Sequence, residues 1–295
     1  MSGTYQRKPD WLRVRLSGGA EFKEISTLVH ERKLHTVCES AMCPNIHECW
    51  GRHKTATFMI LGDTCTRACR FCAVTTGKPL PPDPEEPARV ADAVKTMGVR
   101  HAVITMVTRD DLADGGAGAV ADTVLAIREA APQSTIEVLV SDMNLAPGAI
   151  ARIVSSRPEI NSHNLETVRA LTPEIRSRAD YDRSLGYLRM VKQSDPAAIT
   201  KSSLMLGVGE TRDEILATMD DLRTVGCDII NLGQYLQPTA RNLPVVRYWT
   251  PDEFEELRLR ALERGFAYCQ SGPMVRSSYH AGEQYDRFLE GIRKR

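Results

Sequence analysis

The strongest constraint on the fold is an alternation of short apolar runs with longer helical segments, which begins at Ala56. The runs are rich in β-branched residues and span 56–61, 102–106, 136–140, 159–162, 201–206 and 229–232. Segments of helical period lie near 87–97, 117–131, 146–155, 185–193, 212–225 and 251–264. Six strand-then-helix units with short connections predict a parallel sheet with right-handed crossovers. We therefore expect an α/β fold, a (β/α)6 partial TIM barrel with catalytic groups at the C-terminal ends of its strands.

Three parts of the chain differ in character. Residues 1–54 are polar, carry three of the eight cysteines and four of the seven histidines, and include one expected helix at 21–32. We interpret them as an N-terminal extension, 55–265 as the partial barrel and 266–295 as a C-terminal segment. A length of 295 residues suits one barrel with extensions as well as it suits two domains.

The charge balance and the apolar pattern limit the partners. Thirty-eight Lys+Arg against 38 Asp+Glu argue against a long surface for nucleic acid or an acidic membrane. No stretch approaches the roughly 20 apolar residues that span a bilayer, and residues 1–10 hold no apolar signal core. We expect no nucleic-acid or membrane partner and a cytoplasmic location.

The cysteines carry the chemical information. Six of the eight fall within 35 residues, in two groups of three. In a large chain without a signal peptide, such crowding indicates metal ligation rather than disulfides. The other two, Cys227 and Cys269, are isolated in apolar sequence and are predicted to pack in the core.

The triplet Cys65-Thr-Arg-Ala-Cys69-Arg-Phe-Cys72 follows the first predicted strand directly. Three thiolates from one loop can bind three irons of a [4Fe–4S] cube and leave the fourth iron open to a small molecule. A zinc site is the alternative, but zinc takes four ligands and this loop offers three in an uncommon spacing. An electron-transfer cluster would normally have cysteine on all four irons.

A second triplet, Cys38, Cys43 and Cys49, lies in the N-terminal extension with the spacing CxxxxCxxxxxC. Three thiolates on a short, proline-containing loop again indicate an iron–sulfur cluster. The alternatives are packing residues, or a zinc site completed by His35 or His47.

The spacing CxxxCxxC after the first strand of a barrel resembles that of the radical S-adenosylmethionine (SAM) superfamily. Both triplets, together with Arg276-Ser-Ser-Tyr279, closely resemble the lipoyl synthase family. Further matching stretches lie at 37–45, 58–76, 107–116, 162–166, 200–210 and 234–241. The resemblance implies a radical SAM core with N-terminal and C-terminal extensions.

The resemblance also implies two [4Fe–4S] clusters, with SAM as cofactor. Cys65, Cys69 and Cys72 would hold the cluster whose open iron binds SAM and cleaves it to a 5′-deoxyadenosyl radical. Cys38, Cys43 and Cys49 would hold an auxiliary cluster. Its fourth ligand would be a serine of the Arg-Ser-Ser-Tyr motif, and we favour Ser278 over Ser277.

The reaction implied is the insertion of two sulfur atoms, at C6 and C8, into an octanoyl chain attached to a lysine of a lipoyl carrier domain. The auxiliary cluster would donate the sulfur, and two SAM molecules would give 5′-deoxyadenosine and methionine. The carrier would be a 2-oxoacid dehydrogenase E2 subunit or the glycine cleavage H protein. A ferredoxin or flavodoxin would supply electrons, and an iron–sulfur carrier protein would restore the cluster.

Contacts with SAM are expected at the ends of later strands. Gly207, Gly209 and Glu210 resemble a SAM-contact motif, in which small residues let the backbone approach the adenosine. Asn164 and Glu166 are placed to bond the ribose hydroxyls. From the residues alone, the first group is equally a turn before a helix, and the second a helix cap with a first-turn acid.

Other polar residues have open roles. Residues 109–111 with 114–116 either bind the SAM amino group or form a plain charged loop. Lys201, Arg241 and Arg276 could contact carboxylates, the substrate or a cluster edge. His163 is expected to face the cavity, and His101 to be structural.

Two alternative functions stay open at the level of sequence. Another sulfur-inserting radical SAM enzyme, similar to biotin synthase, would share the barrel and its cysteines. A non-catalytic iron–sulfur or zinc scaffold would bind protein partners and form no 5′-deoxyadenosine from SAM.

Overall fold

The computed structural model describes residues 7–13, 19–51 and 56–293. Residues 1–6 lie outside the described residues. They belong to the stretch 1–10, which is predicted to hold no apolar signal core. The described residues also exclude 52–55, which contain the expected boundary between the extension and the barrel.

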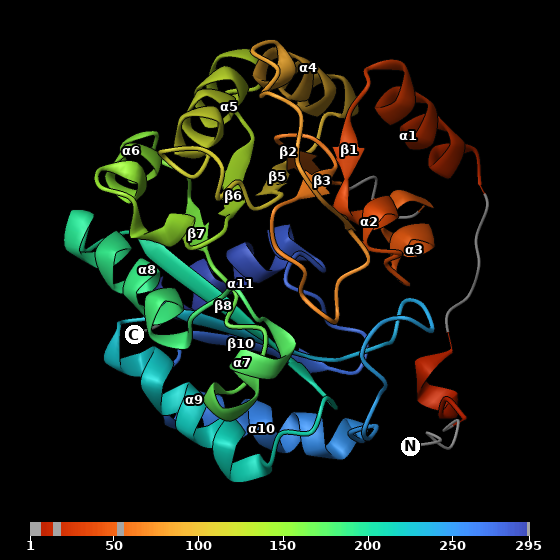
Figure 1. Cartoon of the computed structure of the whole chain (residues 1–295), viewed down its shortest axis with the longest axis vertical. Coiled ribbons are helices and arrows are strands. Elements are labelled where there is room, and N and C mark those ends of the chain that lie inside the picture. Colours follow the sequence, from red (N-terminus) through yellow and green to blue (C-terminus); the bar gives the residue numbers. More distant parts are fainter. Residues whose placement is uncertain (1–6, 14–18, 52–55, 294–295) are drawn as a thin grey trace.

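An eight-stranded sheet forms the centre of the fold (Figure 1). Its strand order is β1-β2-β5-β6-β7-β8-β9-β10. The bounds are β1 His35–Thr36, β2 Thr57–Ile60, β5 His101–Met106, β6 Thr135–Leu139, β7 Ile160–Ser162, β8 Ile199–Leu206, β9 Ile229–Gln234 and β10 Tyr268–Gly272. β1 pairs antiparallel with β2, and every later pair is parallel. The predicted partial barrel is confirmed, with β1 and β10 at the two ends of the order.

Helices cover the outer face of the sheet (Figure 1). They are α4 Glu86–Met97, α5 Ala117–Ala130, α6 Ala149–Ser155, α8 Tyr181–Ser194, α9 Arg212–Thr224 and α10 Pro251–Glu263. All six match predicted helices. The helix α8 begins earlier than the expected 185, because the Asp180 side chain accepts a bond from the Arg183 N–H and caps it. A full capping box of Thr250 and Glu253 starts α10.

The N-terminal extension adds short elements beside β2. The predicted helix is α1, Ala20–Glu31. The cysteine-bearing helices are α2, Val37–Ser40, and α3, Ile46–Gly51. The remaining short elements are η1 Asp10–Leu12, β3 Thr64–Cys65, β4 Thr75–Thr76, η2 Met143–Leu145, η3 Arg169–Leu171 and α7 Thr172–Ile175.

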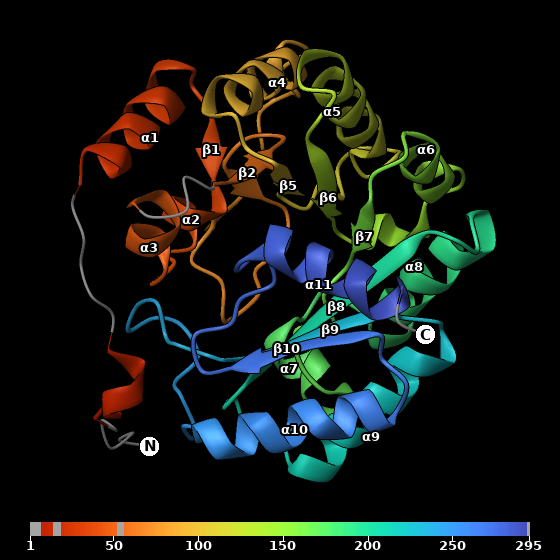
Figure 2. The ribbon, with the colours of Figure 1, turned by 180° about the vertical axis from the view of Figure 1, so that it is seen from behind.

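Two C-terminal elements were not identified in the sequence. β10 pairs with β9 in parallel, so the sheet continues beyond residue 265 into the C-terminal segment. The last helix, α11 Ala281–Arg293, lies across the end of the barrel that faces the viewer in Figure 2. Its Phe288 packs with Ile160 and Ile229, the first residues of β7 and β9. The helix therefore covers the N-terminal ends of the strands and leaves the C-terminal ends to the site.

An ion pair is buried inside the barrel wall. Lys201 on β8 donates a 2.9 Å hydrogen bond to Glu137 on β6, and both side chains are fully buried. Ser162, on the strand between them, donates to the other oxygen of Glu137 at 2.8 Å. Burial raises the pKa of Glu137, but Lys201 and His101 outweigh it and bring the value to about 2. Among the roles left open for Lys201, the structure shows a contact with a carboxylate.

We expect Lys201→Met to lower the free energy of unfolding by ~3–5 kcal/mol, because it removes the ammonium partner of the buried Glu137 charge and leaves it with the Ser162 hydroxyl and His101. Urea denaturation of the wild type and the variant measures the loss. The double variant Glu137→Gln/Lys201→Met removes both charges and should recover most of it. If the single and double variants lose the same stability, the ion pair is not the cause.

Candidate iron–sulfur and SAM site

The loop that carries Cys65, Cys69 and Cys72 starts from a tight turn after β2. Leu61 has a φ of +68° and Gly62 a φ of +90°, so the chain reverses in the left-handed region. The buried carboxylate of Glu86, at the start of α4, accepts a 2.7 Å hydrogen bond from the Leu61 N–H. Burial raises the pKa of Glu86. This contact stabilises an unfavourable turn, from which the loop leaves the end of β2.

Arg67, inside the first triplet, fastens this loop to the neighbouring strand ends. Its buried guanidinium donates two hydrogen bonds to Asp110, each of 2.8 Å, and two to Asp142, of 2.6 and 2.9 Å. A fifth, of 3.1 Å, goes to Asn144. Burial raises the pKa of Asp142, but Arg67 more than reverses this and leaves it well below its usual range. Paired bidentate contacts of this kind fix direction as well as position.

The three thiols of this loop line one cavity of about 450 Å³ at the C-terminal end of the barrel. Burial raises the pKa of Cys69, and raises that of Cys72 to about 12. Such thiols need a nearby positive charge to become thiolates, and a bound metal supplies it. Three half-buried thiols that line one cavity therefore fit the expected ligand set of a cluster.

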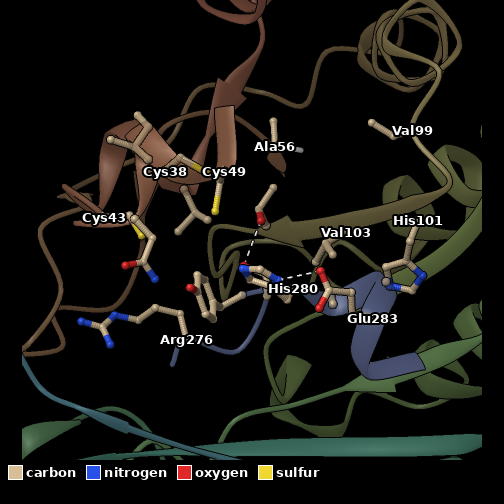
Figure 3. A pocket seen from close by; sticks show the side chains of 18 of the residues that line it. Cys38, Cys43, Cys49, Ala56, Val99, His101, Val103, Arg276, His280 and Glu283 are labelled. Atoms are coloured by element: carbon tan, nitrogen blue, oxygen red, sulfur yellow. Dashed lines mark hydrogen bonds and ion pairs between the residues drawn. The ribbon is translucent and has the colours of Figure 1, made fainter. Parts of the chain in front are cut away.

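The second triplet lies around an adjoining cavity of about 310 Å³. Cys38 lies in α2, Cys43 in the turn that follows and Cys49 in α3. Figure 3 shows the three cysteines on one side of this cavity, with Arg276 below Cys43. Burial raises the pKa of Cys38 to about 11 and also raises that of Cys43, which the charge of Arg276 opposes. A metal bound beside Cys38 and Cys43 would supply the positive charge that their thiols need to become thiolates.

The segment between β10 and α11 reaches the same cavity from the far end of the chain. Its Ser278 accepts a 2.9 Å hydrogen bond from the Thr57 hydroxyl, and Asn45 donates at 2.8 Å to the Met274 carbonyl. The segment passes so close to β9 that a Cβ at Gly233 would lie 2.0 Å from the Val275 carbonyl oxygen. Of the two candidate serines, only Ser278 is among the residues that line the 310 Å³ cavity.

The two cavities share part of their walls. Val37, Cys43, Arg276 and Ser278 line both of them. A group held by the second triplet would therefore lie next to the space that the first triplet faces.

A single metal ion is a poor match to either triplet. Within the described part of the chain, no three His, Cys, Asp or Glu side chains form a group that could hold one ion. Each thiolate of a cube binds a different iron, so the thiolates of a cluster stand farther apart than those around one zinc. The arrangement gives no support to the zinc alternative.

Some of the expected SAM contacts line the 450 Å³ cavity. Asn164 and Glu166 do so, and the Asn164 amide donates a 3.0 Å bond to the Glu166 carboxylate, whose pKa burial raises. His163 lines it too. Its Nδ1 is 2.8 Å from the Val140 carbonyl oxygen, and its Nε2 has no hydrogen-bond partner among the described residues. Burial lowers the pKa of His163 to about 4. The neutral ring then donates from Nδ1, and its buried Nε2 keeps an unused acceptor.

The expected glycine motif lies elsewhere. Gly207, Gly209 and Glu210 are not among the described residues that line the two cavities. Glu210 accepts hydrogen bonds from the N–H groups of Gly207 and Val208, at 2.6 and 2.9 Å, and from the Trp249 indole at 2.8 Å. In this structure these residues hold the turn after β8 together, and their contact with SAM stays a prediction.

The other polar residues are mostly structural. Arg109 is buried against Asp111, and Asp114 accepts from the N–H groups of Gly116 and Gly118. These contacts agree with the charged-loop alternative, and contact with the SAM amino group stays a prediction. His101 lies 2.7 Å from the Thr135 hydroxyl. Arg241 is exposed and lines neither cavity among the described residues. Cys227 and Cys269 lie in the hydrophobic core, which confirms their predicted packing.

Sequence reasoning missed Arg67, Asp142, Arg176 and Thr57. Arg176 lines the larger cavity and donates at 2.8 Å to the Leu165 carbonyl, and its charge lies near Cys69. The one available signal was the position of Arg67 between two cysteines.

Comparison with known proteins gives a consistent result. The model of the radical SAM superfamily matches residues 59–222. Curated lipoyl synthases are similar over nearly the whole chain. That of Halalkalibacterium halodurans is 58% identical over 280 residues, which cover 95% of this chain and 92% of the relative. That of Bacillus subtilis is 55% identical over 278 residues, covering 94% and 93%.

Solved structures of lower identity share the fold. SuiB of Streptococcus suis, bound to its precursor peptide SuiA, gives a TM-score of 0.59 at 13% identity and covers 77% of this chain and 52% of that one. Methylornithine synthase gives 0.54 at 16% identity, covering 79% and 76%.

We expect Arg67→Gln to lower the free energy of unfolding by ~3–5 kcal/mol, because it removes the buried guanidinium that bonds both Asp110 and Asp142 and leaves Asp142 with the half-buried Arg183 alone as its ion-pair partner among the described residues. The Cys69 thiol should also react faster with an alkylating reagent, since the loop loses its anchor. Arg70→Gln is the matched control: Arg70 lies in the same loop, but its ion pair with Glu174 is exposed. The control should change stability by less than ~1 kcal/mol. Equal effects of the two substitutions would contradict the anchoring role of Arg67.

Proposed function

Because this chain belongs to the lipoyl synthase family of the radical SAM superfamily, we propose that its two cysteine triplets hold two [4Fe–4S] clusters with separate tasks. The SAM-binding cluster is assigned to Cys65, Cys69 and Cys72. The auxiliary cluster is assigned to Cys38, Cys43, Cys49 and Ser278. The observation that carries this division is the pair of adjoining cavities, each lined by one triplet and joined at Cys43 and Ser278.

The reaction of the family is the insertion of sulfur at C6 and C8 of a protein-bound octanoyl chain. These carbons carry no polar activation, so proton transfer alone has nothing to act on. When bound, SAM and the two clusters supply the radical that removes hydrogen and the sulfur that replaces it. The protein itself must bind, orient and shield the reacting groups.

The chain's own residues divide these tasks. Arg67 and Glu86 hold the loop of the first triplet in place at the strand ends. Asn164 and Glu166 are proposed to bond the ribose hydroxyls of SAM, and the free Nε2 of His163 to accept a hydrogen bond from the same ligand. Met59, Phe71 and Leu204 give the cavity an apolar part of its wall.

The assignment of Ser278 gives the auxiliary site one ligand unlike the others. A serine oxygen is harder than a thiolate and suits an iron–sulfur core less well. The three cysteines would therefore hold a bound cluster firmly, whereas its bond to Ser278 would break most easily.

The partners follow from the same family. We propose an octanoylated lipoyl carrier domain as substrate, a ferredoxin or flavodoxin as reductant and an iron–sulfur carrier protein for repair. Within the described residues, the helices include none long and apolar enough to cross a bilayer. A cytoplasmic location is part of this proposal.

Reconstitution under nitrogen should give about eight irons per chain, as two [4Fe–4S] clusters require. In Cys38→Ala we expect 5′-deoxyadenosine from SAM and dithionite but no lipoyl product on an octanoylated carrier domain. In Cys65→Ala we expect neither product. Cys227→Ala, a buried cysteine outside both sites, should keep both.

Two results would count against the proposal. Loss of 5′-deoxyadenosine in Cys38→Ala would contradict the division of tasks between the triplets. Its absence in the reconstituted wild type would favour the non-catalytic scaffold.

A further inference from the structure

Thr57 lies beside the proposed fourth ligand of the auxiliary site. It is the first residue of β2 and is buried, with 6% of its surface exposed. Its hydroxyl donates a 2.9 Å hydrogen bond to the Ser278 hydroxyl oxygen. Thr57 also lines the 310 Å³ cavity together with the three cysteines of the second triplet.

The backbone of Thr57 contacts a second proposed ligand. The Thr57 backbone forms a hydrogen bond with the Cys38 thiol. One residue therefore bonds a ligand from the N-terminal extension and a ligand from the C-terminal segment.

Thr57 and Ser278 differ in how firmly the fold holds them. Thr57 is paired in register with Val103 of β5, and its branched side chain has few rotamers available. Ser278 is half-buried in the irregular segment between β10 and α11. A fixed donor that meets a hydroxyl able to rotate selects one of its orientations, as outer hydrogen bonds commonly do for metal ligands.

We propose that Thr57 is a positioning residue of the auxiliary site. Its hydroxyl holds the Ser278 oxygen toward the cysteine cavity and sets how tightly Ser278 binds there. This inference rests on the assignment of Ser278 proposed above. It adds a residue that contacts the ligand rather than the iron.

The test measures iron release from the auxiliary site alone. Full-length chain with Cys65, Cys69 and Cys72 replaced by Ala is reconstituted under nitrogen and mixed with an iron chelator. The rate of iron loss and the Mössbauer spectrum are recorded for Thr57→Val, Thr57→Ser, Ser278→Ala and the double variant Thr57→Val/Ser278→Ala. Removal of an outer hydrogen bond typically weakens metal binding 10–100-fold. We therefore expect Thr57→Val to release iron at least ~10-fold faster.

Three further results are expected. Thr57→Ser keeps the hydroxyl and should release iron at close to the parent rate. Ser278→Ala should resemble Thr57→Val in rate and spectrum, and the double variant should add nothing, because Thr57 acts through Ser278. The control Thr123→Val removes a buried hydroxyl that bonds only its own helix, at Ala119, and should leave the rate unchanged.

Failure of the inference and failure of the ligand assignment give different results. If Ser278→Ala changes neither rate nor spectrum, the assignment of Ser278 is wrong. If Ser278→Ala has its effect but Thr57→Val has none, or the two effects multiply in the double variant, the role of Thr57 is wrong. Thermal unfolding of the apo variants shows whether a change in rate reflects a change in fold.

Discussion

The sheet does not close into a barrel, and the residues after β10 bond strands near both of its ends, β9 and β2. Asn231 of β9 donates a 3.0 Å bond to the Ser277 carbonyl, and Thr57 of β2 donates to Ser278. On the outer side, Asn45 bonds the Met274 carbonyl. Each such bond contributes only about 1 kcal/mol. Together they place one segment between strands that are far apart in the sheet, and that segment forms one wall of the smaller cavity.

The larger cavity depends on buried charge instead. The loop of the first triplet has no extended regular structure, and its position is set by Arg67 against two aspartates and by Glu86 at the preceding turn. Neither contact is useful for folding alone, since burying charges costs free energy that their pairing only partly returns. These contacts orient the loop so that its three thiols line one cavity.

Much of the fold was predictable because it is local. The alternation of strand and helix identified six parallel strands and six helices, and the spacing of the cysteines identified both triplets. β10 was missed because its Gln270-Ser271-Gly272 end lacks the apolar, β-branched character of the other strands. The contacts that orient the site were missed for another reason: Arg67 meets Asp142 across 75 residues, and Thr57 meets Ser278 across 221. Only the closed fold brings these pairs together.

The residues around the smaller cavity are synthesised at different times, because they come from the two ends of the chain. Cys38, Cys43 and Cys49 leave the ribosome long before Ser278, and at ~5–20 residues per second the interval is on the order of ten seconds or more. Until β10 has been made and docked on β9, these three thiols lack the cavity wall that Arg276 and residues 278–283 form, and the proposed fourth ligand is absent. Their oxidation during synthesis would spoil a molecule that is otherwise correctly built. Completion of this site is therefore among the last events in the biogenesis of the chain, although most of its ligands are among the first residues made.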